Sequence, residues 1–243
     1  MTKLDAHYAN PKLAEVYDAG SGWGKDRYFY LSLAGDTPIR ILDLGCGTGL
    51  ICDAYAAKGH IVTGADPAES MLNVARRKPN GHKIEWVQSE AQAFASKNLY
   101  DLVIMTGHAF QVLLEESDVK ATFRMVRDHL APGGRFVFES RNPDIEWESR
   151  WNETEILRLP SADITYERKV HRREGNRIHF ETIYHFDDET LVSQSELRFW
   201  TAAEIKALLE QSGLRVSEFL GDWDGSPFIP SSDEIIFIAQ ARG

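Results

Sequence analysis

The feature that most constrains the fold is a set of three alternating glycines directly after an apolar segment. Ile41–Leu44 leads into Gly45, Gly47 and Gly49, which predicts a β-strand, a tight turn and then a helix. Glycine adopts backbone conformations that other residues rarely reach, and it lets a ligand approach the main chain closely. The following helix would direct its free backbone N–H groups at that ligand. The sequence therefore predicts a loop that binds a small charged molecule.

The spacing of the glycines and a nearby acid indicate which molecule this is. Dinucleotide-binding turns have the pattern G-x-G-x-x-G. Here the third glycine comes one residue earlier, and Asp43 stands two residues before the first. A carboxylate attracts the ammonium and sulfonium groups of S-adenosylmethionine (SAM) but repels a pyrophosphate. The turn therefore favours SAM, and a nicotinamide-dependent oxidoreductase is the alternative.

A second acid ends the next apolar segment, His60–Asp66. Asp66 follows Gly45 by 21 residues, close to the spacing of about 20 at which a ribose-binding carboxylate is found. Its two oxygens can accept hydrogen bonds from both ribose hydroxyls. Asp66 followed by Pro67 would also cap a helix over Ala68–Arg77, and the two roles are compatible.

Apolar segments alternate with helical patterns from residue 39 to 141. Further strands are predicted at Ile84–Gln88, Tyr100–Thr106 and Arg135–Ser140, with an amphipathic helix over Asp118–Leu130. Short runs that are almost wholly apolar are typical of parallel strands buried on both faces. We therefore predict the α/β class, with a Rossmann-like, doubly wound and mostly parallel seven-stranded sheet.

Five segments in this region resemble the ordered motifs of class I SAM-dependent methyltransferases. They are ILDLGCGTG, VTGADP, SEA, YDLVIMTG and LAPGGRFVFES. The resemblance implies a SAM-dependent methyltransferase, and a catalytically inactive SAM-binding regulator is a further alternative. The fourth strand is followed by Thr106-Gly107-His108-Ala109, not by the Asn/Asp-Pro-Pro-Tyr turn of enzymes that methylate DNA amines or protein glutamine. This difference favours a small-molecule acceptor, with an amine or a hydroxyl as the methylated group.

The cofactor site predicted from the turn and the resemblance includes residues from the whole motif region. The resemblance implies that Asp66 binds the ribose, that Glu90 and Ala91 meet the adenine, and that Thr106 and Gly107 border the methionine. Glu90 is alternatively an exposed acid in the first turn of a helix. The predicted residues are Tyr17, Asp43, Gly45, Cys46, Gly47, Gly49, Asp66, Pro67, Met71, Glu90, Ala91, Thr106 and Gly107.

Segments outside the core are expected to select the acceptor, because ligands of open parallel sheets bind beyond the carboxyl ends of the strands. We predict an N-terminal helical lid (1–37), a SAM-binding core (38–141), an antiparallel three-stranded platform (142–200), and a C-terminal helix with the last two core strands (201–243). The platform strands are predicted at Asp163–Arg172, Arg177–Phe186 and Thr190–Trp200. The last core strand, Glu234–Ala239, is expected to be antiparallel and to bring the preceding loop over the pocket.

Five side chains are candidates for contact with the acceptor or for catalysis. Tyr28, Arg141, Trp200 and Trp223 are predicted to bind the acceptor, although aromatic residues at such places equally often pack helices onto a sheet. His108, just past the fourth strand, is the candidate general base, which is needed only if the acceptor arrives protonated. Alternatively, His108 is a helix-start residue bonded to the backbone.

Composition narrows the possible partners and the location. A net charge of −10 argues against nucleic acid as a partner. No apolar run approaches the ~20 residues that span a membrane, so no membrane partner is expected. The two cysteines, Cys46 and Cys52, have no metal-binding spacing, and we predict no metal site and a cytoplasmic protein with reduced thiols. The sequence leaves the oligomeric state undetermined.

Overall fold

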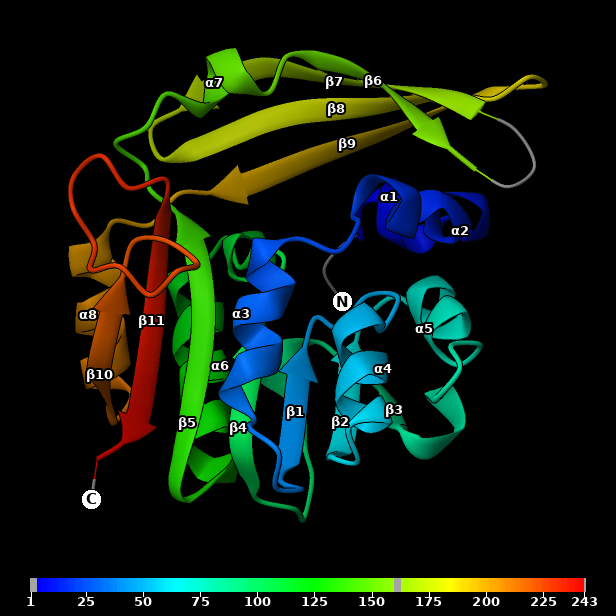
Figure 1. Ribbon diagram of the computed structural model, residues 1–243. Helices are drawn as coiled ribbons and strands as arrows, with labels where there is room; N and C mark the ends of the chain where they lie inside the picture. Colours follow the sequence, from blue (N-terminus) through cyan, green and yellow to red (C-terminus); the bar gives the residue numbers. More distant parts are fainter. Residues whose placement is uncertain (1–3, 160–162, 243) are drawn as a thin grey trace.

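The computed structural model describes residues 4–159 and 163–242, which form two sheets with helices around the larger one (Figure 1). The larger sheet has seven strands. In sheet order they are β10 (Leu214–Leu220), β11 (Glu234–Ala241), β5 (Leu130–Arg141), β4 (Tyr100–Met105), β1 (Arg40–Leu44), β2 (Ile61–Asp66) and β3 (Glu85–Gln88). Pairing is parallel from β5 to β3, whereas β11 is antiparallel to both neighbours. The predicted Rossmann-like sheet and its antiparallel last strand are confirmed.

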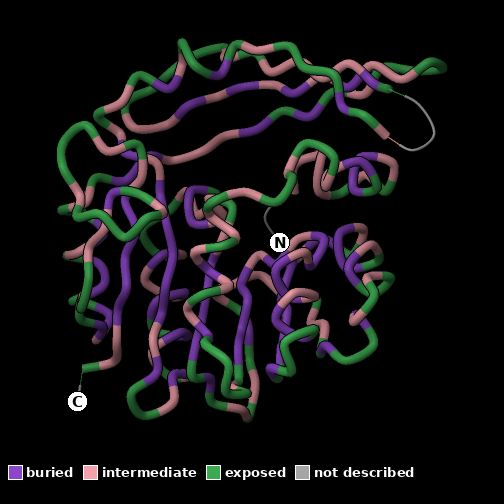
Figure 2. Tube along the Cα trace, viewed as in Figure 1, coloured by how far each residue is buried: buried purple, intermediate pink, exposed green. Residues whose placement is uncertain are grey.

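Helices cover both faces of this sheet, which explains why its central strands are almost wholly apolar. One face carries α3 (Lys25–Leu33), α4 (Leu50–Ala57) and α5 (Glu69–Ala75). The other carries α6 (Glu116–His129) and α8 (Ala202–Gln211). Short 3-10 turns occur at Gly81–Lys83 (η1), Ala91–Ala93 (η2) and Ala109–Val112 (η3). Figure 2 shows the resulting buried residues along the central strands.

The insertion after β5 forms a second sheet, which lies across the carboxyl end of the core (Figure 1). It begins with the short helix α7 (Trp147–Arg150) and continues as β6 (Glu153–Arg158), β7 (Asp163–Glu174), β8 (Arg177–His185) and β9 (Thr190–Arg198). We call these four strands the platform. The prediction of three strands was wrong by one, because β6 is an edge strand that buries only Leu157 fully and has no clear apolar alternation.

The N-terminal helices α1 (Ala6–Ala9) and α2 (Pro11–Gly20) lie between the core and the platform (Figure 1). The Asn10 side chain caps α2 by accepting a hydrogen bond from the backbone N–H of Lys12. The buried side chains of Leu13 and Val16 pack against Leu157 and its platform neighbours. Apolar contact therefore holds α2 to the platform.

The predicted division into four parts includes residues 1–3, 160–162 and 243, which lie outside the described residues. Within the described ranges, no helix is long and apolar enough to cross a membrane. The same ranges contain no cluster of three or more His, Cys, Asp or Glu side chains able to hold a metal ion.

Candidate active site

The glycine turn joins β1 to α4 and has the predicted left-handed backbone. Gly47 has φ 53° and Gly49 has φ 73°. A Cβ atom on Gly49 would lie 2.5 Å from the indole of Trp86, so this glycine is required by close packing as well as by conformation. The turn lies at the carboxyl end of β1, beside β4, where the order of the strands reverses. Ligands of doubly wound sheets bind at this point.

Asp66 connects the glycine turn to the next helix. One carboxylate oxygen accepts a hydrogen bond from the backbone N–H of Gly47 at 2.9 Å, and the other accepts one from Ala68 at 2.8 Å. The second bond orders the turn before α5, whose N-cap residue is Ala68 and has no side-chain cap, so Asp66 does not cap this helix as the alternative prediction had it. Each carboxylate oxygen has two lone pairs, so these bonds leave acceptor capacity for a ribose.

Asp43 is fully buried below the turn. Its Oδ2 accepts a hydrogen bond from the Cys52 thiol at 3.2 Å, and its Oδ1 has no hydrogen-bond partner among the described residues. Burial raises the pKa of Asp43 to about 7. A nearby cation would stabilise the ionised form of this buried carboxylate.

The other predicted cofactor residues lie along the same edge of the sheet, because parallel strands end together. Pro67 follows β2, Glu90 and Ala91 follow β3, and Thr106 and Gly107 follow β4. Cys46 and Met71 are buried beside them, with Met71 packed against Tyr8 and Tyr17. Burial raises the pKa of Cys46 to about 11, so its thiol stays protonated near neutral pH.

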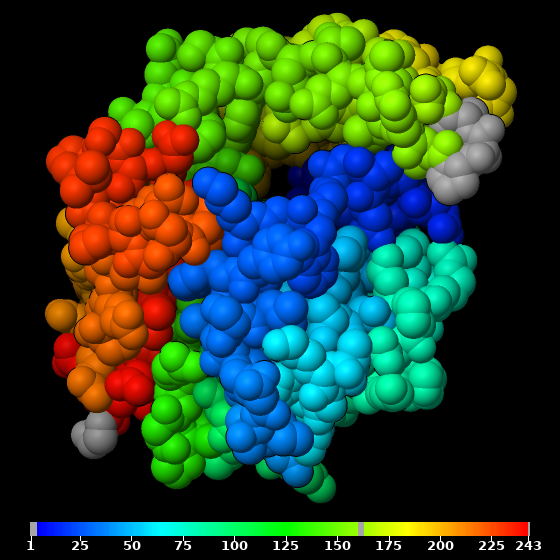
Figure 3. All heavy atoms as spheres, in the orientation of Figure 1, coloured from blue at the N-terminus to red at the C-terminus, as the bar shows by residue number. Residues whose placement is uncertain are grey.

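A cavity of about 470 Å³ is enclosed by the platform, the core and the N-terminal helices (Figure 3). The core contributes Gly107, His108 and Arg141 to its wall, all three of them predicted site residues. The N-terminal helices contribute Tyr17, which is also predicted. The platform side includes Trp151, Glu153, Leu157, Tyr166, Arg168 and Phe180.

Three predicted acceptor residues lie away from this cavity. Trp200 is buried in the core, where its indole N–H donates to the carbonyl of Leu113. Trp223 packs edge-on against Phe29, and Tyr28 is 64% exposed. These aromatic side chains serve packing or face solvent, and we no longer assign them to the acceptor.

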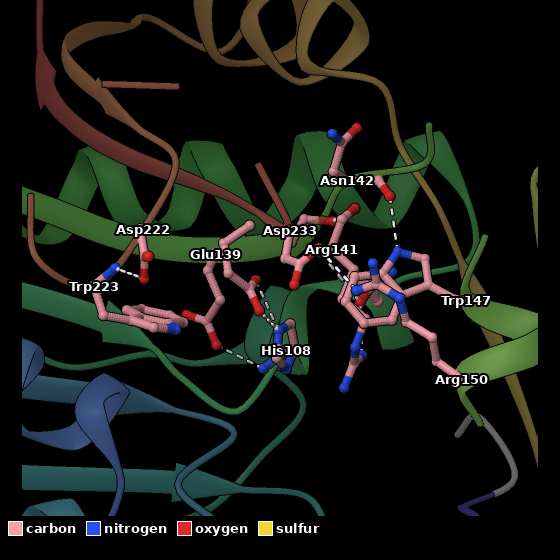
Figure 4. Close-up of polar contacts among 12 residues, drawn as sticks. His108, Glu139, Arg141, Asn142, Trp147, Arg150, Asp222, Trp223 and Asp233 are labelled. Atoms are coloured by element: carbon pink, nitrogen blue, oxygen red, sulfur yellow. Dashed lines mark hydrogen bonds and ion pairs between the residues drawn. The ribbon is translucent and has the colours of Figure 1, made fainter. Parts of the chain in front are cut away.

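His108 lies at the core end of the cavity between two glutamates (Figure 4). Its backbone N–H donates to Glu139 at 2.7 Å, and its Nε2 is 2.9 Å from a carboxylate oxygen of Glu234. The Tyr30 hydroxyl donates to the second oxygen of Glu139. His108 has φ 61°, which makes it the one non-glycine residue in the described ranges with a positive φ. Such a costly conformation is maintained only where the surroundings enforce it.

Burial shifts the protonation of this group toward neutral forms. It lowers the pKa of His108 to about 3, with a further contribution from the charge of Arg141. It raises the pKa of Glu234 to about 7. Near neutral pH the imidazole therefore carries no charge, and its Nδ1 has no hydrogen-bond partner in the described part of the chain.

Two residues of this arrangement were missed from the sequence. Glu139 stands in the otherwise apolar segment Phe136–Ser140, and a lone carboxylate in a buried strand was a signal that could have been followed. Glu234 begins the last strand and gave no such signal, because only the antiparallel return of β11 brings it to His108.

Comparison with known proteins agrees with the fold and the turn. Residues 41–134 match the family model described as a methyltransferase domain. The cypemycin N-terminal methyltransferase of a Streptomyces species is 25% identical over 205 residues, 83% of each chain. The ubiquinone biosynthesis O-methyltransferase of Pseudomonas putida is 34% identical over 137 residues, 54% of this chain and 55% of the relative. Apart from the first of these, the chain spans about half the length of the curated relatives it matches.

A solved structure extends the likeness in fold to nearly the whole chain. The CcbJ methyltransferase from Streptomyces caelestis has a TM-score of 0.78 at 22% identity, covering 95% of this chain and 96% of the other. This likeness shows the fold of nearly the whole chain, and the methyltransferase-domain match together with the glycine turn supports SAM-dependent methyl transfer. The cofactor of the chain is S-adenosylmethionine.

Proposed function

We propose that the enzyme transfers a methyl group from SAM to an amine of a small-molecule acceptor bound in the cavity below the platform. A volume of about 470 Å³ is within the range of pockets for small ligands. The cavity reaches Gly107, which borders the predicted methionine site. We assign cofactor binding to the carboxyl edge of the core, and acceptor binding to the platform and the N-terminal helices.

The observation that carries the proposal is the pairing of His108 with Glu234 at the core end of this cavity. A Nε2–H bond to the carboxylate fixes the tautomer in which Nδ1 has a free lone pair. Once Glu234 is ionised, its charge opposes the effect of burial on the pKa of His108, and this nitrogen can accept the proton of an ammonium. Only the neutral amine can then attack the methyl group. Glu234 then stabilises the imidazolium that forms, and Glu139 fixes the histidine backbone.

Carboxylates around His108 favour an amine acceptor. Glu139 and Asp26 both act on the imidazole electrostatically, and Glu234 contacts it directly. The charge of Arg141 opposes these acids at the imidazole, but an ammonium group placed among the three carboxylates gains an attraction that a neutral hydroxyl does not. The cypemycin N-terminal methyltransferase, which aligns with most of the chain, acts by name at an N-terminus, and an N-terminus carries an amine.

The first test is a labelled-methyl screen with pooled small amines and matched pools of alcohols. We expect product in the amine pools. With an acceptor in hand, the rate at subsaturating substrate should rise with pH through about 7, because the ionised Glu234 makes His108 a stronger base. Glu234→Gln should flatten that rise.

His108→Asn provides the matched test of the base, because asparagine tolerates the left-handed backbone that alanine does not. We expect at least a hundredfold loss in kcat, within the range of about 10²–10⁴ for a general base, with unchanged affinity for S-adenosylhomocysteine. Full activity of His108→Asn would refute the proton-transfer role. Product in the alcohol pools alone would show that the acceptor group is a hydroxyl and not an amine. The names of the ubiquinone biosynthesis O-methyltransferases describe transfer to oxygen.

A further inference from the structure

Two arginines from different sheets line the same wall of the cavity. Arg141 ends β5 of the core, and Arg168 lies in β7 of the platform. Both guanidinium groups lie against the same indole, with distances to the Trp151 ring of 4.8 Å for Arg141 and 5.7 Å for Arg168. Trp151 itself is buried, so it provides a rigid surface between the two sheets. The fold thus brings two like charges together in one partly enclosed space.

Arg141 has little to balance its charge. Its Nη1 donates to the Gln111 side chain at 2.9 Å, and none of the ion pairs in the described residues involves Arg141. Figure 4 shows it beside Trp147, on the opposite side of His108 from Glu139. Burial and the neighbouring charge of Arg168 lower the pKa of Arg141 to about 10. The acids Glu139 and Glu234 attract it without forming an ion pair with it.

Arg168 is held in place but is also incompletely satisfied. Its Nη1 pairs with Glu153 at 3.0 Å, and its Nη2 donates to the Tyr166 hydroxyl. Its Nε is buried and has no hydrogen-bond partner among the described residues. Of the other acids in the cavity wall, Asp5 stands at the start of α1, Asp26 is next to Arg27, and Glu155 is exposed. Within the described ranges, the ion pair of Arg168 with Glu153 is the one that either of these two cations forms.

We propose that Arg141 and Arg168 form a subsite for an oxyanion of the acceptor, either a carboxylate or a phosphate group. Two planar guanidinium groups can bind such an anion through paired N–H donors. An anion there would compensate the charge of Arg141, which has no ion pair within the described residues, and would give the buried Nε of Arg168 a hydrogen-bond acceptor. The inference rests on the proposed function and specifies its substrate class: an acceptor with an amine at His108 and an anionic group toward Trp151.

The first experiment measures anion binding without any methyl transfer. The cofactor-bound enzyme, saturated with S-adenosylhomocysteine, is titrated with inorganic phosphate and with acetate at constant ionic strength, and the dissociation constant is measured by calorimetry. We expect saturable binding of at least one anion. Arg141→Gln and Arg168→Gln should each weaken it at least tenfold, because each removes charge-assisted hydrogen bonds. Arg172→Gln, on the same strand but 60% exposed and paired with Glu174, is the matched control and should bind the anion normally.

The second experiment uses matched acceptors that differ only in the anionic group. The pairs are glucosamine 6-phosphate with glucosamine, and 6-aminohexanoate with 6-aminohexanamide. We expect a higher kcat/KM for the anionic member of at least one pair, and the pair that shows it distinguishes phosphate from carboxylate. The preference should fall at least tenfold in Arg141→Gln and Arg168→Gln but not in Arg172→Gln.

The outcomes separate the subsite from the reaction. Unchanged anion binding in both Arg141→Gln and Arg168→Gln, or no anion binding by the wild type, overturns the subsite. Normal anion binding that requires both arginines, with no methyl transfer to any amine, refutes the proposed function and leaves the anion subsite standing. Circular dichroism and melting temperature show whether each variant is folded, so that loss of binding is not confused with unfolding.

Discussion

The buried carboxylate of Asp43 makes a quantitative prediction about stability and pH. Its pKa of about 7, against an ordinary value of 3.8, means that the folded protein holds this proton more tightly than the unfolded chain. Stability should therefore fall as pH rises from about 4 to 7, and change little through this group at higher pH. A shift of about three pKa units corresponds to roughly 4 kcal/mol, at about 1.36 kcal/mol per unit.

Asp43→Asn removes this dependence, because asparagine remains uncharged at every pH. We expect the free energy of unfolding of the variant, relative to wild type, to rise by about 4 kcal/mol between pH 4 and pH 8. The measurement is urea denaturation of the cofactor-free proteins at several pH values. Asp36→Asn, which removes an exposed carboxylate, is the control. If the difference in free energy of unfolding between variant and wild type stays constant within about 1 kcal/mol across this pH range, burial does not raise the pKa of Asp43.

Cofactor binding gives the same residue a second readout. An ammonium group beside Asp43 stabilises the ionised carboxylate, so SAM affinity should increase with pH up to about 7 in the wild type. Asp43→Asn should bind SAM more weakly at pH 8 and show no such rise. Equal SAM affinity of both proteins at every pH would assign Asp43 to the support of the turn alone.

Two further predictions concern the glycine turn and its neighbouring acid. Asp66→Ala should weaken SAM binding at least tenfold, since charge-assisted hydrogen bonds contribute roughly 1.5–3 kcal/mol each. The variant should also have a lower melting temperature, because the bonds from Gly47 and Ala68 are lost. Normal SAM affinity with a lower melting temperature would leave Asp66 only its structural role. Gly49→Ala should destabilise the protein more than Gly47→Ala, because only the former places a methyl group against Trp86. Equal melting temperatures of the two variants would contradict this packing argument.

The sequence was sufficient for the core because its signals are local. Short, almost wholly apolar segments between helical segments specify strands that are buried on both faces. The glycines of the turn specify the left-handed backbone that the structure contains. The position of Asp66 at the end of β2 follows from the same reasoning. The missed strand β6 shows the limit of pattern analysis, because an exposed edge strand has little reason to alternate.

The acceptor site was harder to predict because its residues meet only through tertiary structure. Trp200 and Trp223 were chosen for their chemical type, but packing partners on other elements decide where an aromatic ring lies. Arg141 was placed correctly at the end of a core strand, yet its relation to Arg168 depends on how the platform folds over it. Composition alone cannot reveal a contact between two sheets that the chain joins through α7 after β5 and again through the segment from β9 to α8.

Helix α2 connects the two ligand sites physically. Asp18 near its end binds the Thr48 hydroxyl in the glycine turn and the Lys78 ammonium beyond α5, while Val16 and Leu13 pack on the platform. A partly exposed ion pair contributes only about 0–1 kcal/mol, whereas each buried aliphatic side chain contributes about 1.5–3 kcal/mol. The apolar contacts with the platform are therefore the stronger attachment of α2. Since Tyr17 of the same helix lines the acceptor cavity, a displacement of α2 that opens the cofactor turn also changes the shape of the acceptor site.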